Sequence, residues 1–333
     1  MTVRKLYTSN LFWACLIFAG ILLFNALFTP NFFRIEIRDG HLFGSVIDIF
    51  DRASPIILMA TGMTLVIATK GIDISVGSVA AISGALVAVL IAKYNASPVV
   101  FILVPLCVAL ILGAWNGLLV SWVGMQPIIA TLILMVTGRG IAMLITGGQI
   151  IVFRNTFIEK VIGGYFLGLP FSILIAVVVA LGVSLLTRRT ALGIFIESIG
   201  INPTACRYAG VRVQQVLFSV FVISATCAGI AGFKYISDIR AADANNSGLF
   251  SELDAILAVV IGGTSMNGGR YSIIGSFIGA LVIQSLTTTI LTRGVPVQVT
   301  YVLRSAVVVI ICILQSPVLS DRLSRMKKER VEA

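Results

Sequence analysis

The sequence predicts an all-α protein that crosses a membrane about ten times. Of its 333 residues, 58% are hydrophobic and only 11% are charged, whereas a soluble domain usually carries about 25% charged residues. The apolar residues form long runs, and the segments between them are short and contain most of the charges and many of the glycines. We therefore expect one transmembrane domain over residues 1–333 and exclude a soluble protein.

Ten apolar runs are expected to form the membrane helices. The expected spans are 11–28, 55–69, 73–92, 99–123, 127–146, 171–187, 216–236, 253–263, 271–291 and 297–315. The first run follows Arg4 and Lys5, as in a signal peptide, but it has no convincing cleavage site and is expected to be retained. Residues 29–52 mix charged with apolar residues, so an external surface segment is predicted there.

Two later features modify this simple pattern. Gly71 allows the chain to turn between the second and third spans, and the side chain of Asp73 or Ser75 can cap the third. The run 253–263 is too short for a hydrocarbon core of about 30 Å, because a helix rises about 1.5 Å per residue. This run must recruit flanking residues or lie among neighbouring helices. The segment 239–251 before it is expected to be an external loop.

The distribution of Lys and Arg predicts the orientation. With ten spans and both termini in the cytoplasm, the cytoplasmic segments hold 13 Lys and Arg residues and the external segments hold nine. This excess is what the positive-inside rule requires. Most of it comes from the segment 188–214 and the basic tail 316–333, and an odd number of spans would place these two on opposite sides.

The segment 188–214 is predicted to contain a short helix in the cytoplasm. Asn202 can cap a helix, Pro203 is tolerated in its first turn, and Gly210 can end it. Because Ala205 and Ala209 are small, another protein could approach this helix closely. The alternative is an ordinary loop helix that lies on the bilayer surface.

Four motifs resemble those of the permease subunits of bacterial ABC sugar importers, the group that takes up ribose, arabinose, xylose and galactofuranose. They are Gly71-Ile72-Asp73-Ile74-Ser75-Val76-Gly77, Gln126-Pro127-Ile128-Ile129-Ala130-Thr131-Leu132, Ala191-Leu192-Gly193 through Ala209-Gly210-Val211, and Val260-Ile261-Gly262-Gly263-Thr264-Ser265-Met266-Asn267-Gly268-Gly269. The resemblance covers nearly the whole chain, and Cys206 is a small departure where these permeases more often have alanine. It implies that 188–214 is the loop coupled to an ATPase, with Glu197, Gly200, Asn202, Pro203, Ala205, Arg207, Ala209 and Gly210 as its site residues.

The same resemblance implies the location and the partners. We expect a protein of the bacterial inner membrane, in contact with lipid, that works with an ABC ATPase subunit, a second permease and a periplasmic sugar-binding protein. ATP is expected on the ATPase subunit, with no cofactor on this chain and no nucleic-acid partner. The runs 39–45 and 239–246 look most similar to galactofuranose-type permeases, which pair with a non-identical permease. Import of another pentose or hexose is the alternative.

A few polar or aromatic residues within the runs are candidates for specific roles. A cation inside a span costs about 2.5 to 3.5 kcal/mol, so Arg139 and Arg304 are expected to face protein or water. Arg139 either lines the translocation route, with Trp115 and Asn116 as further candidates, or has a structural role. In the structural role it snorkels from a helix end or bonds to the carbonyls of a broken helix. Arg304 is expected to be structural, with Gln284 as its neighbour.

Glycines four residues apart have a packing role in such spans. Gly113 with Gly117 and Gly275 with Gly279 have the spacing that lets helices approach closely. Packing within the subunit is favoured over a dimer interface.

Other function classes fit the sequence poorly. No G-x-x-x-x-G-K-S/T loop is present, so ATP hydrolysis by this chain is not expected. The single histidine, His41, and the scattered cysteines predict no metal site and no catalytic triad. A proton-coupled secondary transporter needs an acid deep in a span, and all fourteen acids are expected in loops or at helix ends. A membrane scaffold leaves the Asn202-Pro203 helix unexplained.

Overall fold

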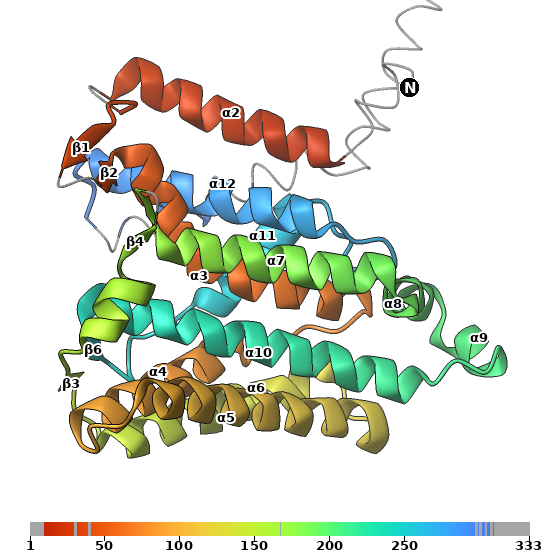
Figure 1. Cartoon of the computed structure of the whole chain (residues 1–333). Coiled ribbons are helices and arrows are strands. Elements are labelled where there is room, and N and C mark those ends of the chain that lie inside the picture. The colour runs from red at the N-terminus through yellow and green to blue at the C-terminus, as the bar shows by residue number, and fades with distance from the viewer. Residues whose placement is uncertain are drawn as a thin grey trace, which may run out of the picture.

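Helices that run side by side along one direction make up most of the molecule (Figure 1). This computed structural model describes residues 10–29, 32–38, 41–166 and 168–296, and a few single positions between 299 and 309. The helices are α2 (Asn10–Phe28), α3 (Ser45–Ala68), α4 (Val76–Ala92), α5 (Pro98–Leu118), the π-helix η1 (Leu119–Val123), α6 (Pro127–Thr146), the π-helix η2 (Ile158–Ile162), α7 (Phe171–Arg189), α8 (Ala191–Ile201), α9 (Pro203–Tyr208), α10 (Val213–Ile239), α11 (Ser251–Ile261) and α12 (Ile273–Thr292).

Three short antiparallel strand pairs lie at the end of the bundle opposite α9 (Figure 1). They are β1 (Glu36–Arg38) with β2 (His41–Phe43), β3 (Ile151–Val152) with β6 (Ala241–Ala242), and β4 (Tyr165–Phe166) with β5 (Leu169–Pro170). Each pair joins residues from the connections between helices. The fold is therefore helical with small two-stranded links at one end.

Seven of the described helices are long and apolar enough to cross a membrane. They are α2, α3, α5 with η1, α6, α7, α10 and α12. The predicted spans 73–92 and 253–263 correspond to the shorter helices α4 and α11. The tenth predicted span, 297–315, lies almost wholly outside the described residues, as does the tail 316–333. The fold is thus a helical membrane bundle, and the total of ten spans stays a prediction.

Helix α3 begins at Ser45, ten residues before the start expected at Pro55. Residues 45–52 of the predicted external surface segment are therefore helical, and their position outside the membrane stays a prediction. Proline inside a helix leaves the carbonyl four residues earlier without its usual donor. Here the Ser54 hydroxyl donates to the carbonyl oxygen of Asp51 at 2.7 Å, which replaces that missing bond. The helix continues through Pro55 for this reason.

Helices α3 and α10 lie at the centre of the bundle, and close contacts join them to their neighbours. A Cβ on Gly62 would lie 2.6 Å from the Cα of Ser224 in α10. Cβ atoms on Gly113 and Gly117 would likewise collide with α10. Gly275 and Gly279 in α12 approach the backbone of α11 in the same way. The prediction that both glycine pairs serve packing within the subunit is confirmed.

Helices α4 and α11 both begin inside the bundle. Gly77, the second residue of α4, lies against Gly248, and the carboxylate of Glu252 in α11 lies beside it. Helix α11 is 11 residues long, or about 16 Å at 1.5 Å per residue, which is roughly half of a hydrocarbon core of about 30 Å. Its far end meets the start of α12, where Gly262 touches Gly275. The amino-terminal ends of two short helices therefore meet near the middle of the bundle.

The segments that lead into these two helices also enter the bundle. Asp73, expected on the cytoplasmic side, is buried and accepts a hydrogen bond from Ser224, near the middle of α10. After β6, the segment 243–250 runs inward until Gly248 reaches Gly77. The interpretation of 239–251 as a purely external loop was wrong, because small residues on both sides let this segment pass between helices.

Candidate functional site

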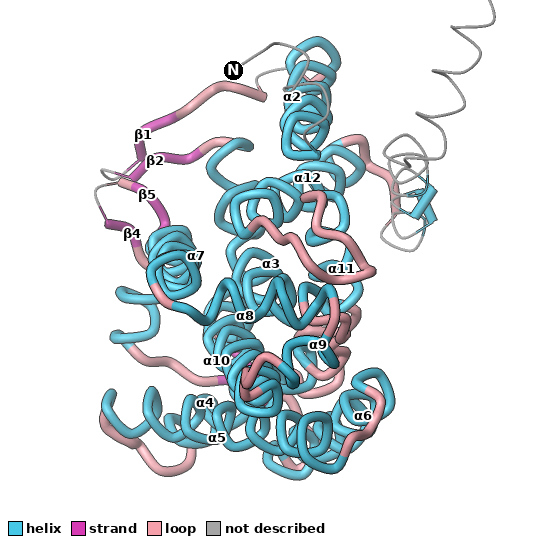
Figure 2. Tube along the Cα trace, turned by 90° about the vertical axis from the view of Figure 1, so that its right-hand side faces the viewer, coloured by secondary structure: helices cyan, strands magenta, loops and turns pink. Residues whose placement is uncertain are grey.

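The short helix α9 projects from one end of the bundle (Figures 1 and 2). The Asn202 side chain accepts a hydrogen bond from the Ala205 amide at 3.0 Å, and Pro203 is the first helical residue. Gly210 follows the helix with a φ of 80°, in the left-handed region that glycine adopts without strain. The predicted helix start and stop are confirmed. The projecting element covers Thr190 to Arg212, since residues 188–189 and 213–214 belong to α7 and α10.

The surface of α9 is almost entirely free of contacts with the rest of the chain. Ala205, Arg207 and Ala209 are exposed, as predicted for a docking surface. Tyr208, which the sequence analysis did not select, is 90% exposed. Only Cys206 is buried, and it packs with Val211 and Val213 at the base of the helix. An exposed tyrosine flanked by alanines is the kind of surface that a partner protein can bury.

Helix α8 connects α9 to the membrane part of the protein. The Lys70 Nζ donates to the carbonyl of Ile201 at 3.1 Å, at the last residue of α8. Gly200 is buried against the Ala68 carbonyl at the end of α3 and against Gly269. Of the predicted coupling residues, Gly200 therefore lies beneath the docking surface, and Glu197 is half-buried on α8. These contacts connect the segment that carries α9 to the end of α3 and to the turn before α12.

The surroundings of α9 are basic and partly hydrophobic. A hollow of about 430 Å³ is lined by Trp122, Arg207 and Arg212 together with Gly210, Val211, Val213, Gln214 and Gln215. Under α8, Tyr271 lies where a Cβ on Gly193 would approach its hydroxyl to 3.0 Å. Burial raises the pKa of the Tyr271 hydroxyl above its ordinary value, so this group keeps its proton. The exposed charges suit a partner with acidic groups.

The three predicted pathway residues do not come together. Trp115 is 54% exposed on the outer face of α5, whereas Asn116 is buried and donates from Nδ2 to the Ser75 hydroxyl at 2.9 Å. Arg139 is half-buried on α6. Its Nη1 donates to the carbonyl oxygens of Ala244 at 3.1 Å and Ser247 at 2.6 Å. These bonds to irregular backbone are the structural alternative that the sequence left open for Arg139.

A buried carboxylate fixes the break between α3 and α4. Asp73 Oδ1 accepts from the Ser75 amide at 3.1 Å and from its hydroxyl at 2.6 Å, and Oδ2 accepts from the Ser224 hydroxyl at 2.8 Å. Ser75 is the residue before α4, but its side chain makes no capping bond. Asp73 and Ser75 therefore do not simply cap α4. They form a hydrogen-bond network with Asn116 of α5 and Ser224 of α10, which joins the break to these two helices.

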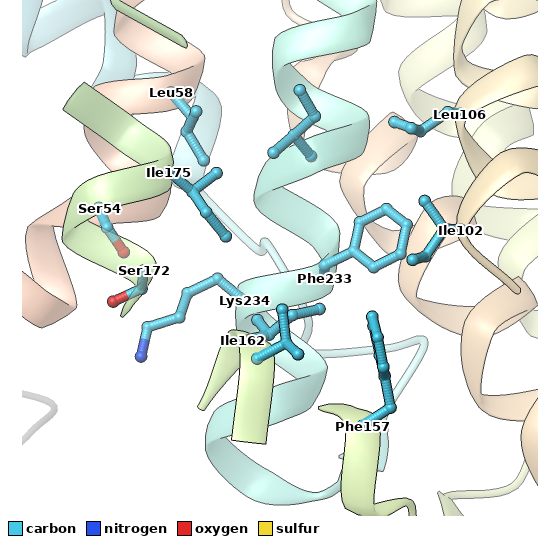
Figure 3. Close-up of a pocket in the computed structure, with 12 residues that line it drawn as sticks. Ser54, Leu58, Ile102, Leu106, Phe157, Ile162, Ser172, Ile175, Phe233 and Lys234 are labelled. Carbon is cyan, nitrogen blue, oxygen red and sulfur yellow. The ribbon is translucent and has the colours of Figure 1, made fainter. Parts of the chain in front are cut away.

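The sequence analysis missed a second buried charge. Lys234 in α10 is 4% exposed, and its Nζ lies 2.8 Å from Asp51 Oδ2 and 2.5 Å from Asp238 Oδ1. Ser172 of α7 donates to the other oxygen of Asp51. Figure 3 shows Lys234 extending toward Ser172, beside an apolar cavity of about 180 Å³ between α5, α7 and α10. The four-residue spacing of Lys234 and Asp238 in the sequence could have predicted this ion pair, because residues four apart lie on the same face of a helix.

The predicted structural pair of Arg304 and Gln284 is only half described. Gln284 is buried in α12, and its Nε2 donates to the Thr288 hydroxyl at 3.2 Å. Arg304 lies outside the described residues.

A helical bundle with seven candidate spans, two helices that begin at mid-bundle and a projecting helix at one end has the architecture of a polytopic membrane protein. Residues 45–312 match the family model described as "Branched-chain amino acid transport system / permease component". The chain belongs to this family of ABC transporter permeases, and it is a multi-span protein of the bacterial inner membrane. The family implies an ATPase and a substrate-binding protein as partners.

Several curated permeases are similar to this chain over most of its length. It is 49% identical to the galactofuranose transporter permease protein YtfT of Escherichia coli (strain K12), over 89% of this chain and 86% of that one. It is 40% identical to the fructose import permease protein FruF of Bifidobacterium longum (strain NCC 2705), over 98% and 94%. The ribose import permease protein RbsC of Escherichia coli (strain K12) is 34% identical, over 86% and 87%. No solved structure matches the chain.

Proposed function

We propose that this chain forms the membrane pathway of an ABC sugar importer and that its sugar is galactofuranose or a closely similar monosaccharide. The observation that carries the proposal is the 49% identity to the galactofuranose permease, which extends over 89% of the chain. The lower identities to a fructose and a ribose permease keep the substrate within the sugars. The sequence argument against an ion-coupled transporter was that no acid lies deep in a span, and the buried Asp73 and Glu252 remove it. The family membership now excludes that alternative.

ATP hydrolysis is assigned to a separate ATPase subunit in this proposal. The sequence contains no phosphate-binding loop with lysine. The exposed α9 supplies a docking surface, and α8, which directly precedes it, contacts the end of α3. A second permease, identical or not, completes the pathway, and a periplasmic binding protein delivers the sugar.

The proposed topology has ten spans with both termini in the cytoplasm. In this arrangement the turn after α7 and the turn after α4 lie on opposite sides of the membrane. A reporter inserted after Arg189 is expected to be active only in the cytoplasm, and one inserted at Tyr94 only outside. The measurement is the activity of a paired phosphatase and fluorescent-protein reporter at each position. Reporters at both positions on the same side would contradict the ten-span topology.

Uptake by the assembled importer tests the function itself. Cells that lack their own sugar importers would express this permease with its ATPase, its second permease and its binding protein. We expect uptake of labelled galactofuranose that requires the permease and the ATPase and is not displaced by ribose or fructose. Uptake of ribose or fructose alone would overturn the sugar assignment, and uptake without any ATPase subunit would overturn the ABC assignment.

A further inference from the structure

Two helices of this bundle begin near its middle and not at its ends. Gly77 at the start of α4 touches Gly248, two residues before the N-cap of α11. From this point α4 runs toward the end with β3 and β6, and α11 runs toward the end with α8, where Gly269 bonds to Ala68. In transporters, binding sites near the bilayer midplane are typically formed by such discontinuous helices.

The segment 243–250 that leads into α11 is polar and irregular, although it lies at this depth. Asn245 and Asn246 are exposed on its outer surface. Irregular backbone at membrane depth is tolerated only where it is buried in protein or faces a water-filled cavity, because lipid cannot satisfy its polar groups. The exposed amides at this level therefore face water or protein and not lipid. Figure 2 shows α6 and α11, which flank the segment, on the same side of the bundle.

The segment is held in one conformation by its own contacts. Arg139 binds its carbonyls at Ala244 and Ser247, and Asp243 accepts hydrogen bonds from the amides of Asn245 and Asn246 at 3.0 and 3.3 Å. Phe250 at its end has a φ of 62°, which is rare for an aromatic residue. Non-glycine residues in such conformations cluster at binding and active sites.

A buried acceptor lies behind the segment. Glu252 in the first turn of α11 is 7% exposed, and among the described residues its Oε2 accepts no hydrogen bond. A buried polar group without a partner carries a desolvation penalty, so it marks a place where a donor group would be stabilised. Gly77 leaves room for this carboxylate, since a Cβ there would collide with Oε2.

We propose that the segment 243–250, with Glu252 behind it, is the surface over which the sugar passes at the middle of the membrane. The Asn246 Nδ2 donates to Asp243 Oδ2 at 2.7 Å, which orients this amide and leaves its oxygen and second N–H for other partners. Asn245 and Asn246 hydrogen-bond to sugar hydroxyls through these groups, because an amide both donates and accepts as a hydroxyl requires. The exposed Leu249 and Phe250 contact the apolar face of the sugar ring. Arg139 is a positioning residue that fixes the segment. This inference rests on the proposed sugar transport and adds the place of contact.

Thiol labelling tests whether the segment faces water. In a permease with its five cysteines replaced, Asn246→Cys is expected to react with a membrane-impermeant maleimide in the assembled importer. Ile111 is 66% exposed on the apolar face of α5 in the same bundle. Ile111→Cys is therefore the control that is expected to face lipid and not to react. Tyr94→Cys, in the turn after α4, gives the rate for full exposure. Labelling at 246 is expected to be slower than at 94 and to fall when sugar-loaded binding protein and ATP are added.

Transport provides the second measurement. Asn246→Ala is expected to lower the maximal rate of sugar uptake about tenfold, because loss of one hydrogen bond of about 1.4 kcal/mol has that effect. Capture of the ATPase subunit and the membrane level should stay unchanged. Arg139→Gln should remove the sugar protection at position 246, and Arg139→Lys should restore part of it.

The outcomes separate this inference from the proposed function. The segment does not line the route if the wild-type importer transports sugar but the thiol of Asn246→Cys does not react with the maleimide. The same holds if a bifunctional maleimide links this thiol only to the second permease. Labelling without protection by the sugar would show an external loop and would also overturn the inference. If the wild-type importer transports no sugar at all, the proposed function fails instead.

Discussion

Replacing Ala205 with tryptophan is expected to abolish sugar uptake while the permease still folds and inserts. Ala205 is an exposed residue in the middle of α9, outside the bilayer, so a larger side chain there disturbs no contact within the described part of the chain. In a docked complex the same side chain would occupy the space of the ATPase surface. Overpacking of this kind costs about 1 to 3 kcal/mol, or roughly a 5- to 150-fold weaker association.

The measurement is capture of the ATPase subunit by the tagged permease, together with uptake of labelled sugar. Ala205→Ser is the matched control, because it keeps a small side chain at the same position and should behave as wild type. A tryptophan variant with normal capture and normal uptake would show that α9 is not the docking surface.

Replacing Lys234 with methionine is expected to destabilise the whole bundle. Its Nζ is the positive partner of both Asp51 and Asp238, and the change leaves these two carboxylates without their cation. Removing one partner of a buried ion pair costs about 3 to 5 kcal/mol, because the remaining charge stays buried without compensation. The loss is expected near the lower end of this range, since the triad joins α3 to α10 but the side chains of Asp51 and Asp238 are 24% and 41% exposed.

The thermal midpoint of the purified permease in detergent measures this effect. Arg52→Met is the control, because the Arg52 side chain is 61% exposed in its pair with Asp48 and such pairs contribute about 1 kcal/mol or less. Adding Asp51→Asn and Asp238→Asn to the Lys234 variant should recover most of the stability. An equal loss in the Lys234 and Arg52 variants, or no recovery in the triple variant, would contradict the role assigned to the triad.

The sequence was informative wherever a local signal decided the structure. Asn202, Pro203 and Gly210 define α9 through bonds and dihedral angles of neighbouring residues, and these do not depend on the rest of the fold. The apolar runs likewise located α2 to α7 and α10 to α12, although the ends moved by up to ten residues, and they gave no signal for α8.

The features that depend on distant residues were not predictable in this way. Whether Asp73 lies at a membrane surface or inside depends on Ser224, which is 151 positions away. The continuation of α3 through Pro55 depends on the Ser54 hydroxyl, a detail that hydropathy does not register. The ion pair of Lys234 with Asp51 joins residues 183 positions apart, and no local signal in the sequence connects them.

Helix α11 is short, and its two ends lie in very different places. Its carboxyl-terminal end leads to Gly268 and Gly269, which touch Gly200, and to the start of α12. Its amino-terminal end lies against Gly77 in the interior. A rigid rod roughly 16 Å long that tilts by about 10° moves its far end by roughly 3 Å, about the length of one hydrogen bond. Because Gly262 and Gly279 hold α11 tightly against α12, the two helices must tilt together. A small displacement at the end of α11 beside α8 would therefore also move the end that lies against Gly77.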